Sequence, residues 1–317
     1  MIVGIIGSGV AGLSCADRLA AEGVGSVLFD KGKRPGGRLT SLRVENMAWD
    51  LGAQYFSAGS GRFAHQVAAW QAAGVVAPWP AGPEGAMVGV PAMASLIEAQ
   101  CDGRDVRFNS LVHRIDLRSD GWRVSGPGLD EGPFDAIVIA VPPEQAIPLL
   151  SLHDFSMARD FIGVRSQPCW TAMVAFAEPL AHLPPFLRDA GPVAWAARNS
   201  SKPGRPEAEC WVLQASADWS ISNLEIEKAE AASRLLAAFA EHLATDLPDP
   251  IFLKAHRWRF SQTLGGKGRT AWNASLRLGI CGDWCIAPRI EGAWQSGHDL
   301  ADQLIRSLAA PQRQASG

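Results

Sequence analysis

The sequence has little tyrosine, few charged residues and no familiar pairing of its cysteines. Its 317 residues include one Tyr, Tyr55, against twelve Trp and twelve Phe. The six Cys are scattered without a C-x-x-C pair, which argues against a disulfide scaffold, a usual zinc site or a thioredoxin-type site. With 29 Lys and Arg against 32 Asp and Glu, the net charge is −3, which excludes a generally basic protein that coats nucleic acid.

Long apolar runs and targeting segments are also missing. No apolar run reaches the ~18 residues that a membrane-spanning helix needs. The chain turns apolar at Ile2 without a basic region or a small-residue cleavage site, so we predict no signal peptide. We therefore expect a cytoplasmic protein whose partners include neither a membrane nor nucleic acid. The composition, 47% hydrophobic and 19% charged, is that of a globular chain, and its length favours two domains or one large one.

The most informative motif lies at the N-terminus. Residues 2–6 form an apolar run that predicts a buried strand, and residues 13–21 have the apolar spacing of a helix. Residues 7–12 between them read G-S-G-V-A-G, and a second apolar run, 26–29, ends at Asp30. In such a β-α-β unit the glycines allow a tight turn, a close pyrophosphate and close helix packing, while the carboxylate binds a ribose. We therefore predict dinucleotide binding; a purely structural glycine turn is the alternative.

Two further segments indicate FAD rather than NAD. The loop Gly36-Gly37-Arg38 suggests a second approach of backbone to phosphate, with the Arg38 guanidinium as a forked partner. Near the other end, an apolar run stops at Asp283, which can bind a polyol hydroxyl, and a predicted helix follows. Gly292 and Ala293 at its start leave room for a flat ring, and its positive end would stabilise negative charge on a reduced flavin. Arg38 as a solvated charge and Asp283 as a turn residue remain alternatives.

The remaining pattern predicts an α/β fold, α+β overall. We expect strands at 106–108, 112–117, 122–124, 134–141, 170–176, 209–215 and 276–281, and helices at 224–247 and 291–308. We expect a discontinuous Rossmann-like FAD-binding domain and a mixed-sheet substrate domain. The predicted FAD-binding domain comprises residues 1–56, 95–150 and 256–317, and the predicted substrate domain residues 57–94 and 151–255.

Taken together, these motifs resemble the FAD-binding pattern of the flavin amine oxidase superfamily. The resemblance rests on 7–12, 36–38, 50–56 (DLGAQYF), 139–143 (IAVPP) and 282–283. More narrowly, the chain resembles bacterial renalase-type flavoproteins almost end to end, through residues 195–205, 211–215, 256–258, 281–285 and 289–294. It departs from them at 259–263, Arg-Phe-Ser-Gln-Thr, where an aromatic-Ala-x-Pro run is expected, so this loop can differ in shape.

The resemblance implies a non-covalent FAD oxidase. Such enzymes take hydride from 2- or 6-dihydro isomers of NAD(P)H onto flavin N5, giving NAD(P)+, and O2 as acceptor then gives H2O2. Because the ring regains aromaticity and no proton leaves, orientation carries most of the rate, and we expect no catalytic triad and no metal. The cofactor-binding residues that the resemblance implies are Gly7, Gly9, Val10, Ala11, Gly12, Asp30, Lys31, Gly37, Arg38, Gly52, Ala53, Gln54, Tyr55, Val112, Ala140, Gly282, Asp283, Glu291, Gly292 and Ala293.

The candidate substrate contacts are polar and aromatic side chains of these motifs, namely Gln54, Tyr55, Asn199, His256, Trp258 and Trp294. Each could instead be an ordinary packed residue. Residues 251–282 contain six Lys or Arg and no Asp or Glu, which would attract an anionic dinucleotide and repel an amine. Three further cations are candidate ligands of the substrate phosphates, namely Arg198, Lys202 and Arg205. A solvated basic face is the alternative.

Two other functions remain open. A flavin amine oxidase acting on a small amine often has a Lys near flavin N5, for which Lys254 and Lys267 are the candidates by position. A dinucleotide-binding or redox-sensing protein without turnover is the other alternative.

Overall fold

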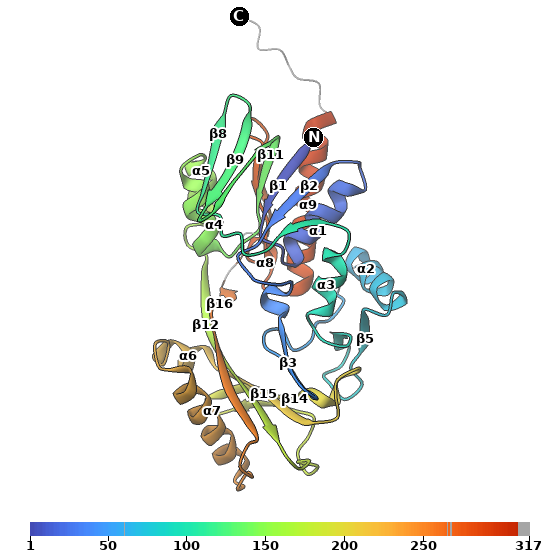
Figure 1. Ribbon diagram of the computed structural model, residues 1–317, viewed down its shortest axis with the longest axis vertical. Helices are drawn as coiled ribbons and strands as arrows, with labels where there is room; N and C mark the ends of the chain where they lie inside the picture. Colours follow the sequence, from blue (N-terminus) through green and yellow to red (C-terminus); the bar gives the residue numbers. More distant parts are fainter. Residues whose placement is uncertain (60, 265, 267, 310–317) are drawn as a thin grey trace, which may run out of the picture. The chain divides into compact units, whose positions relative to one another are not determined.

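The computed structural model describes residues 1–59, 61–264, 266 and 268–309 (Figure 1). By their internal contacts the residues form two compact units. Unit 1 comprises Met1–Pro35, Gln100–Arg165 and Leu264–Gly317, and unit 2 comprises Gly36–Ala99 and Ser166–Thr263. Unit 1 holds a Rossmann-like α/β domain and unit 2 a second sheet with its own helix, so the predicted fold class is confirmed.

The bounds of these units differ from the predicted domains at four segments, 36–56, 95–99, 151–165 and 256–263. Residues 36–56 belong to unit 2, because Trp49 stacks on Phe252 with ring centroids 4.4 Å apart and donates its indole N–H to the Val174 carbonyl, 2.9 Å away. Residues 151–165 belong to unit 1, because Phe161 packs edge-on against Trp284 at 5.3 Å. Which unit binds which ligand stays a prediction.

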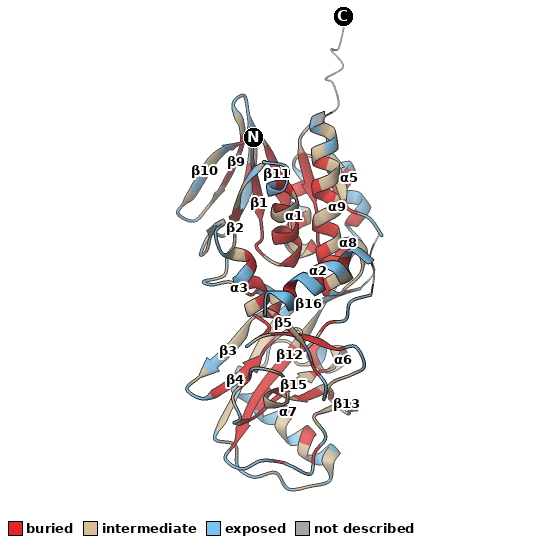
Figure 2. Cartoon of the chain, turned by 90° about the vertical axis from the view of Figure 1, so that its right-hand side faces the viewer, coloured by how far each residue is buried: buried red, intermediate tan, exposed pale blue. Residues whose placement is uncertain are grey.

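Unit 1 is built on a six-stranded sheet in the order β17-β18-β11-β1-β2-β7. The strands β1, β2, β7, β11 and β18 are parallel, and β17 runs antiparallel at the edge. The central strands consist almost wholly of buried apolar residues, as expected for a parallel sheet covered by helices on its faces (Figure 2). The bounds are β1 Ile2–Ile6, β2 Gly25–Phe29, β7 Asp105–Arg107, β11 Ala136–Ile139, β17 Ala271–Asn273 and β18 Leu278–Ile280.

Two helices of unit 1, from opposite ends of the chain, cross closely. Helix α1 spans Val10–Ala20 and helix α9 spans Ile290–Ala309. A Cβ on Gly297 would lie 2.0 Å from the Ala11 carbonyl oxygen, so only glycine allows this approach. The Ser14 hydroxyl donates to the Trp294 carbonyl at 2.7 Å across the same contact. The remaining elements of unit 1 are β8 Arg114–Arg118, β9 Gly121–Gly126, β10 Leu129–Phe134, α4 Pro143–Ser151, α5 Phe155–Phe161 and α8 Asp283–Ile286.

Unit 2 is built on a five-stranded sheet in the order β13-β14-β15-β12-β16. Helix α7, Lys228–Leu243, covers one face, where its Leu235 and Phe239 pack with Trp170 and Trp211 of the sheet. We call this the α7 face. On the opposite face, Trp49 packs over Met173 and Val212. The strands are β12 Arg165–Phe176, β13 Phe186–Ala190, β14 Val193–Arg198, β15 Glu209–Ala215 and β16 Phe252–Leu264.

The other elements of unit 2 are short. They are the hairpins β3 Ser41–Val44 with β4 Met47–Asp50 and β5 Val76–Pro78 with β6 Met87–Gly89, the helices α2 Gly61–Ala72 and α6 Ala217–Ser222, and the 3-10 turns η1 Gly37–Leu39 and η2 Asn199–Ser201. Helix α3, Ser95–Cys101, begins in unit 2 and ends in unit 1. Within the described residues, no helix is both long enough and apolar enough to cross a bilayer.

Candidate functional site

The glycine turn of unit 1 uses its three glycines for two purposes. Gly7 has φ +106°, and a Cβ there would lie 2.5 Å from the Ala140 carbonyl oxygen. A Cβ on Gly12 would lie 2.0 Å from the Gly7 carbonyl oxygen, so both residues are required by packing. Gly9, the N-cap of α1, has nothing within 4 Å of the position that a Cβ would take, and it makes no side-chain cap. This open backbone at a helix N-terminus fits the approach of a pyrophosphate.

Asp30, the residue predicted to bind a ribose, lies beside the glycine turn. It follows β2, and its carboxylate accepts hydrogen bonds from the Ser8 N–H at 2.9 Å, the Ser8 hydroxyl at 2.8 Å and the Gly32 N–H at 2.7 Å. These donors orient the carboxylate beside the glycine turn and leave it further lone pairs for hydroxyl donors. The structure therefore brings Asp30 and the G-x-G-x-x-G turn together, as the sequence predicts.

The late motif of unit 1 follows β18, which lies beside β11, the neighbour of β1 in the sheet. The Cys281 N–H donates to the Ile139 carbonyl at 3.1 Å, so the ends of β11 and β18 lie together. Asp283 is buried in the first turn of α8, and the N–H of Gly282 before it donates to the Ser296 hydroxyl at 2.9 Å. Ligands of open α/β sheets bind at such carboxyl ends of neighbouring strands.

Gly292 has a structural role that the sequence did not indicate. A Cβ there would lie 2.2 Å from the Ala287 carbonyl oxygen, so this glycine is needed where α8 passes into α9. Ala293 is buried at the same place. That a flavin ring lies against these two residues stays a prediction.

The two motif segments of unit 2 are packed directly on one another. A Cβ on Gly52 would lie 1.9 Å from the Arg38 carbonyl oxygen, and the Ala53 N–H donates to that oxygen at 3.0 Å. The Arg38 guanidinium donates to the Ser261 carbonyl at 3.0 Å. Gly37 has φ +52° and nothing within 4 Å of a Cβ position. The predicted phosphate loop and the 50–56 motif thus form one local structure.

A buried group of charged and amide side chains, which we call the Asp50 cluster, lies next to this loop. It consists of Asp50, Gln54, Asn199, Lys202 and Arg205, and the exposed fraction of each is below one tenth. The Asp50 carboxylate accepts from the Lys202 ammonium at 3.0 Å and from the Arg205 guanidinium at 2.7 Å. The ammonium also donates to the Gln54 side-chain oxygen at 3.0 Å and to that of Asn199 at 3.1 Å. Segments far apart in sequence are joined here.

The Asp50 carboxylate is stabilised by both cations of the cluster, whereas the two cations repel each other. Burial alone would raise the pKa of Asp50, but the Lys202 and Arg205 charges and the Met93 N–H outweigh it and hold the pKa well below its usual value. Burial, reinforced by Arg205, lowers the pKa of Lys202 to about 8 although Asp50 opposes this. A buried carboxylate with two cations is costly to desolvate, and each partner depends on the others.

The three candidate phosphate ligands do not form an exposed basic patch. Lys202 and Arg205 are buried against Asp50, and Arg198 contacts Glu209 at 3.0 Å. Arg198 also lies over the Trp211 ring on the α7 face, whereas Trp49 and Asp50 belong to the strand that packs on the opposite face. All three cations are paired with buried carboxylates, so their charges are already compensated. Phosphate binding by them stays a prediction, which these contacts do not favour.

The two amides expected to bind a carboxamide are also engaged. The Gln54 amide donates to the Asp50 carbonyl at 2.6 Å and accepts from Lys202. The Asn199 amide donates to the Ala48 carbonyl at 2.9 Å and accepts from Lys202. Both hold the 48–54 segment in place, which sequence reasoning missed because the partners are distant along the chain.

An aromatic cluster adjoins the Asp50 cluster. Tyr55 lies 5.4 Å from Trp195, which stacks on Phe186 at 5.2 Å with an interplanar angle of 13°. Trp79 lies 6.4 Å from Tyr55, and the Lys202 ammonium lies 5.5 Å above the Trp79 ring. The exposed Arg188 guanidinium donates to the Tyr55 hydroxyl at 3.2 Å and lies 5.2 Å from the Trp195 ring. Tyr55 was singled out from the sequence, but its aromatic neighbours and Arg188 were not.

The other candidate substrate contacts lie elsewhere. Trp258 and His256 are on β16, the opposite edge strand from β13, with rings 4.4 Å apart, and the Trp258 indole donates to the Leu51 carbonyl at 3.0 Å. Burial and the charge of Lys228 lower the pKa of His256 below its usual value. Trp294 is buried in unit 1 on α9. Within the described residues of unit 2, neither His256 nor Trp258 makes a ring contact with the aromatic cluster.

The basic stretch 251–282 is partly neutralised by acids. Arg257 and Arg259 share Glu225, at 2.9 Å and 2.7 Å. Lys254, a candidate lysine of an amine oxidase, is exposed on β16 with its ammonium 5.3 Å from the Phe252 ring. Lys267, the other candidate, lies outside the described residues.

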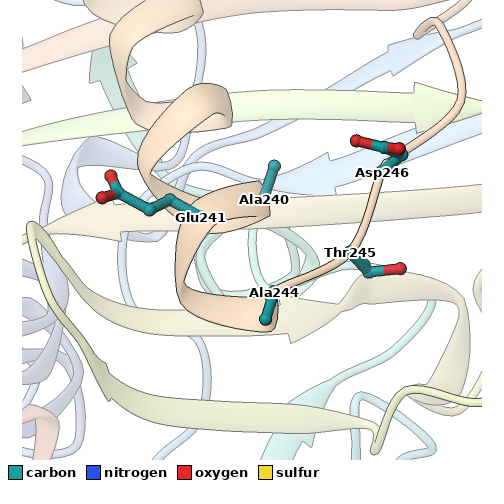
Figure 3. A pocket seen from close by; sticks show the side chains of 5 residues that line it. All are labelled: Ala240, Glu241, Ala244, Thr245 and Asp246. Atoms are coloured by element: carbon teal, nitrogen blue, oxygen red, sulfur yellow. The ribbon is translucent and has the colours of Figure 1, made fainter.

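A hollow on the surface of unit 2 is lined by none of the residues of these motifs. It has a volume of about 340 Å³ and lies at the end of α7 (Figure 3). Its lining is Ala240, Glu241, Ala244, Thr245 and Asp246, which offers two carboxylates and no aromatic ring. This hollow provides nothing that would hold a flavin or a dinucleotide.

Comparison with known families agrees with the glycine turn and its surroundings. Residues 5–70 match the model of an NAD(P)-binding Rossmann-like domain, and residues 75–305 match that of flavin containing amine oxidoreductases. The second match covers most of the chain. The chain belongs to the flavin-containing amine oxidoreductase family. A flavin family with a Rossmann-like dinucleotide-binding domain uses FAD, so FAD is the cofactor of this member.

Individual relatives of this family member are distant or match only in part. It is 46% identical over 48 residues to a zeta-carotene-forming phytoene desaturase of Myxococcus xanthus, and 36% identical over 52 residues to a 4,4'-diapophytoene desaturase of Staphylococcus haemolyticus. These segments span 15% and 16% of this chain but only 9% and 10% of the relatives. Their reactions therefore carry no conclusion for this chain by themselves.

Solved structures confirm the fold over nearly the whole chain. Cyclohexylamine oxidase from Brevibacterium oxydans IH-35A superposes with a TM-score of 0.76 at 13% identity, covering 97% of this chain and 99% of that one. Wild-type putrescine oxidase bound to putrescine gives a TM-score of 0.69 at 13% identity, covering 96% and 99%. The predicted superfamily and cofactor are confirmed by the family match, whereas the enzymatic activity and the renalase type stay predictions.

Proposed function

We propose that this chain is a renalase-like FAD oxidase that takes hydride from 2- or 6-dihydro isomers of NAD(P)H and yields NAD(P)+. The observation that supports it is the aromatic cluster Tyr55-Trp79-Phe186-Trp195 with Arg188 beside it. Flat rings suit a neutral, planar dihydropyridine, and an adjacent guanidinium suits the phosphate that this ring carries in a dinucleotide. The same guanidinium would repel an ammonium substrate.

The residues of unit 1 would hold the dinucleotide part of the cofactor. The open N-terminus of α1 at Gly9 would receive the pyrophosphate, and Asp30 would bind a ribose. Oxidised FAD supplies an acceptor for a hydride, that is, for two electrons and one proton. The substrate ring loses that hydride and becomes a pyridinium, while O2 takes two electrons and two protons to give H2O2, one of the protons coming from solvent.

The chain's own contribution under this proposal is binding and orientation. The ring regains aromaticity as hydride leaves, so no side chain has to remove a proton. The aromatic cluster would hold the ring flat, and the Asp50 cluster would keep the 50–55 loop and Tyr55 in place. Orientation of this kind supplies a large part of the rate of a two-reactant step.

The test is anaerobic bleaching of the visible flavin band. The FAD-loaded protein is mixed with 2-dihydro and 6-dihydro isomers of NADH and NADPH, ordinary NADH, putrescine and cyclohexylamine. We expect rapid bleaching by the isomers alone and, on admission of O2, one H2O2 per isomer oxidised. A yellow protein that no isomer bleaches would refute the proposal.

A second candidate is oxidation of a small amine, which the family match supports. Aromatic rings also bind cations, so the aromatic cluster could contact an ammonium group. Bleaching by an amine and not by the isomers would select this candidate. A yellow protein that nothing bleaches would support a dinucleotide-binding or redox-sensing protein without turnover.

A further inference from the structure

Three side chains form a row across unit 2 on the face opposite α7. In the strand register, Arg188 of β13 pairs with Trp195 of β14, and Trp195 pairs with Gln214 of β15. The residues that flank this row point the other way, since Leu187 pairs with Ala196 in the apolar cluster under α7. Neighbouring strands are about 4.8 Å apart, so the row spans about 10 Å. It presents a cation, an indole ring and an amide in that order.

Two polar atoms of this row have no hydrogen-bond partner among the described residues. The Trp195 indole N–H is buried and has no acceptor among the described residues. Gln214 donates through its amide nitrogen to the Gly52 carbonyl at 2.6 Å, which orients its side chain, and no donor to its amide oxygen is found in the described parts of the chain. A buried polar group without a partner costs about 1–3 kcal/mol, so the Trp195 N–H points to a ligand, while the partly exposed Gln214 amide oxygen can accept a further hydrogen bond.

The charge at the end of the row is also uncompensated. Within residues 1–59, 61–264, 266 and 268–309, Arg188 makes no ion pair, unlike Arg198, Lys202 and Arg205. It is exposed, and its hydrogen bond to the Tyr55 hydroxyl, at 3.2 Å, leaves further N–H groups of the guanidinium for an anion.

Resting on the proposed function, we infer that the row Arg188-Trp195-Gln214 determines specificity for the nicotinamide mononucleotide half of the substrate. Arg188 binds the phosphate, and the edge of the Trp195 indole, whose ring is stacked on Phe186, faces the substrate. The Trp195 N–H donates to the carboxamide oxygen, and the Gln214 amide oxygen accepts from the carboxamide nitrogen. A carboxamide has both a carbonyl acceptor and N–H donors, which is the complement of these two unpartnered atoms. A simple amine has neither the carbonyl nor the phosphate.

Binding of nicotinamide mononucleotide to the oxidised FAD-loaded protein tests this directly. The oxidised mononucleotide cannot transfer hydride, so calorimetry gives a dissociation constant without turnover. We expect Arg188→Gln to weaken binding of the mononucleotide about tenfold and to remove most of its dependence on salt. Binding of nicotinamide riboside, which lacks the phosphate, should not change. Arg114→Gln, the same loss of charge at an exposed site of unit 1, is the matched control.

The carboxamide contact needs its own variants. Trp195→Phe keeps a ring for stacking on Phe186 but removes the N–H, and should weaken the mononucleotide and the riboside alike, by about fivefold to tenfold. Gln214→Leu should do the same. An unchanged visible flavin spectrum shows that each variant is folded and loaded with FAD.

The outcomes separate this inference from the proposed function. Unchanged affinity in Arg188→Gln and Trp195→Phe, or no binding of the mononucleotide to the wild type at millimolar concentration, overturns the inference whatever the bleaching assay gives. If the variants weaken binding as expected but the isomers fail to bleach the flavin, the inference stands and the proposed oxidase activity falls.

Discussion

The glycine turn of unit 1 and the Asp50 cluster of unit 2 fix the backbone of two candidate binding segments in opposite ways. The turn is shaped by the absence of side chains, since Gly7 and Gly12 are packed against carbonyl oxygens and Gly9 is open. The 50–55 loop is held by side chains, since Lys202, Asn199 and Arg205 reach it from a segment about 150 residues away in sequence. A local steric requirement maintains the first, and long-range buried charge maintains the second.

This difference determines how each region should respond to substitution. Removing one partner of a buried ionic group leaves an uncompensated charge, whereas adding a methyl group to a glycine forces backbone apart. A substitution in the Asp50 cluster should therefore change the free energy of unfolding more than one in the glycine turn, and the size of its effect should depend on pH.

The largest effect is expected for Asp50→Asn. The substitution keeps the shape of the side chain but leaves the buried Lys202 and Arg205 cations without a carboxylate, so it should lower the free energy of unfolding by about 3–5 kcal/mol. Urea unfolding followed by circular dichroism measures it. Asp116→Asn, which breaks an exposed pair with Arg114, should cost no more than about 1 kcal/mol. Equal effects of the two substitutions would contradict the role of the cluster.

Lys202→Met should change how stability depends on pH. The folded-state pKa of Lys202, about 8, lies below its ordinary value of 10.5, so the unfolded chain binds more protons between these values. Wild-type stability should therefore rise relative to the variant as pH rises from 8 to 10.5, by about 3 kcal/mol. Urea unfolding at several pH values in this window checks it. A constant difference between the two proteins would mean that Lys202 does not titrate there.

The glycine turn offers a matched pair with smaller effects on stability. Gly12→Ala should destabilise the fold by about 1–3 kcal/mol, because its Cβ meets the Gly7 carbonyl. Gly9→Asp should leave stability nearly unchanged, since the position is open and Asp is a good N-cap. Its carboxylate would nevertheless repel the pyrophosphate, so the purified variant should be colourless. A Gly9→Asp protein that remains yellow would refute the placement of the phosphates.

The sequence predicted well those features that depend on neighbouring residues. The N-terminal β-α-β unit and the C-terminal helix, predicted at 291–308 and found at Ile290–Ala309, follow local apolar spacing. The helix predicted at 224–247 is shorter, Lys228–Leu243, because the backbone at Ala244 turns to φ +49° and ends it. The strand predicted at 134–141 is β11, Ala136–Ile139, with Phe134 ending the preceding strand.

Side-chain partnerships across the chain were beyond such reasoning. Lys202 and Arg205 looked like part of an exposed basic patch because their partner, Asp50, lies in another motif. Arg188, Trp195 and Gln214 meet only through the register of three strands, which no local pattern specifies. The sequence indicated candidate cofactor residues of this family member from local motifs, whereas its candidate substrate contacts required the fold.

The crossing of α1 and α9 affects how the chain can be synthesised. The hydrogen bond from Ser14 to the Trp294 carbonyl joins residues 280 positions apart, and Gly297 lies against Ala11 beside it. A nascent chain on the ribosome completes its first helix long before the partner helix emerges. The apolar side of α1 therefore lacks this partner until α9 has been translated. A stop codon introduced before α9 should thus leave that side of α1 uncovered and the polypeptide prone to aggregation.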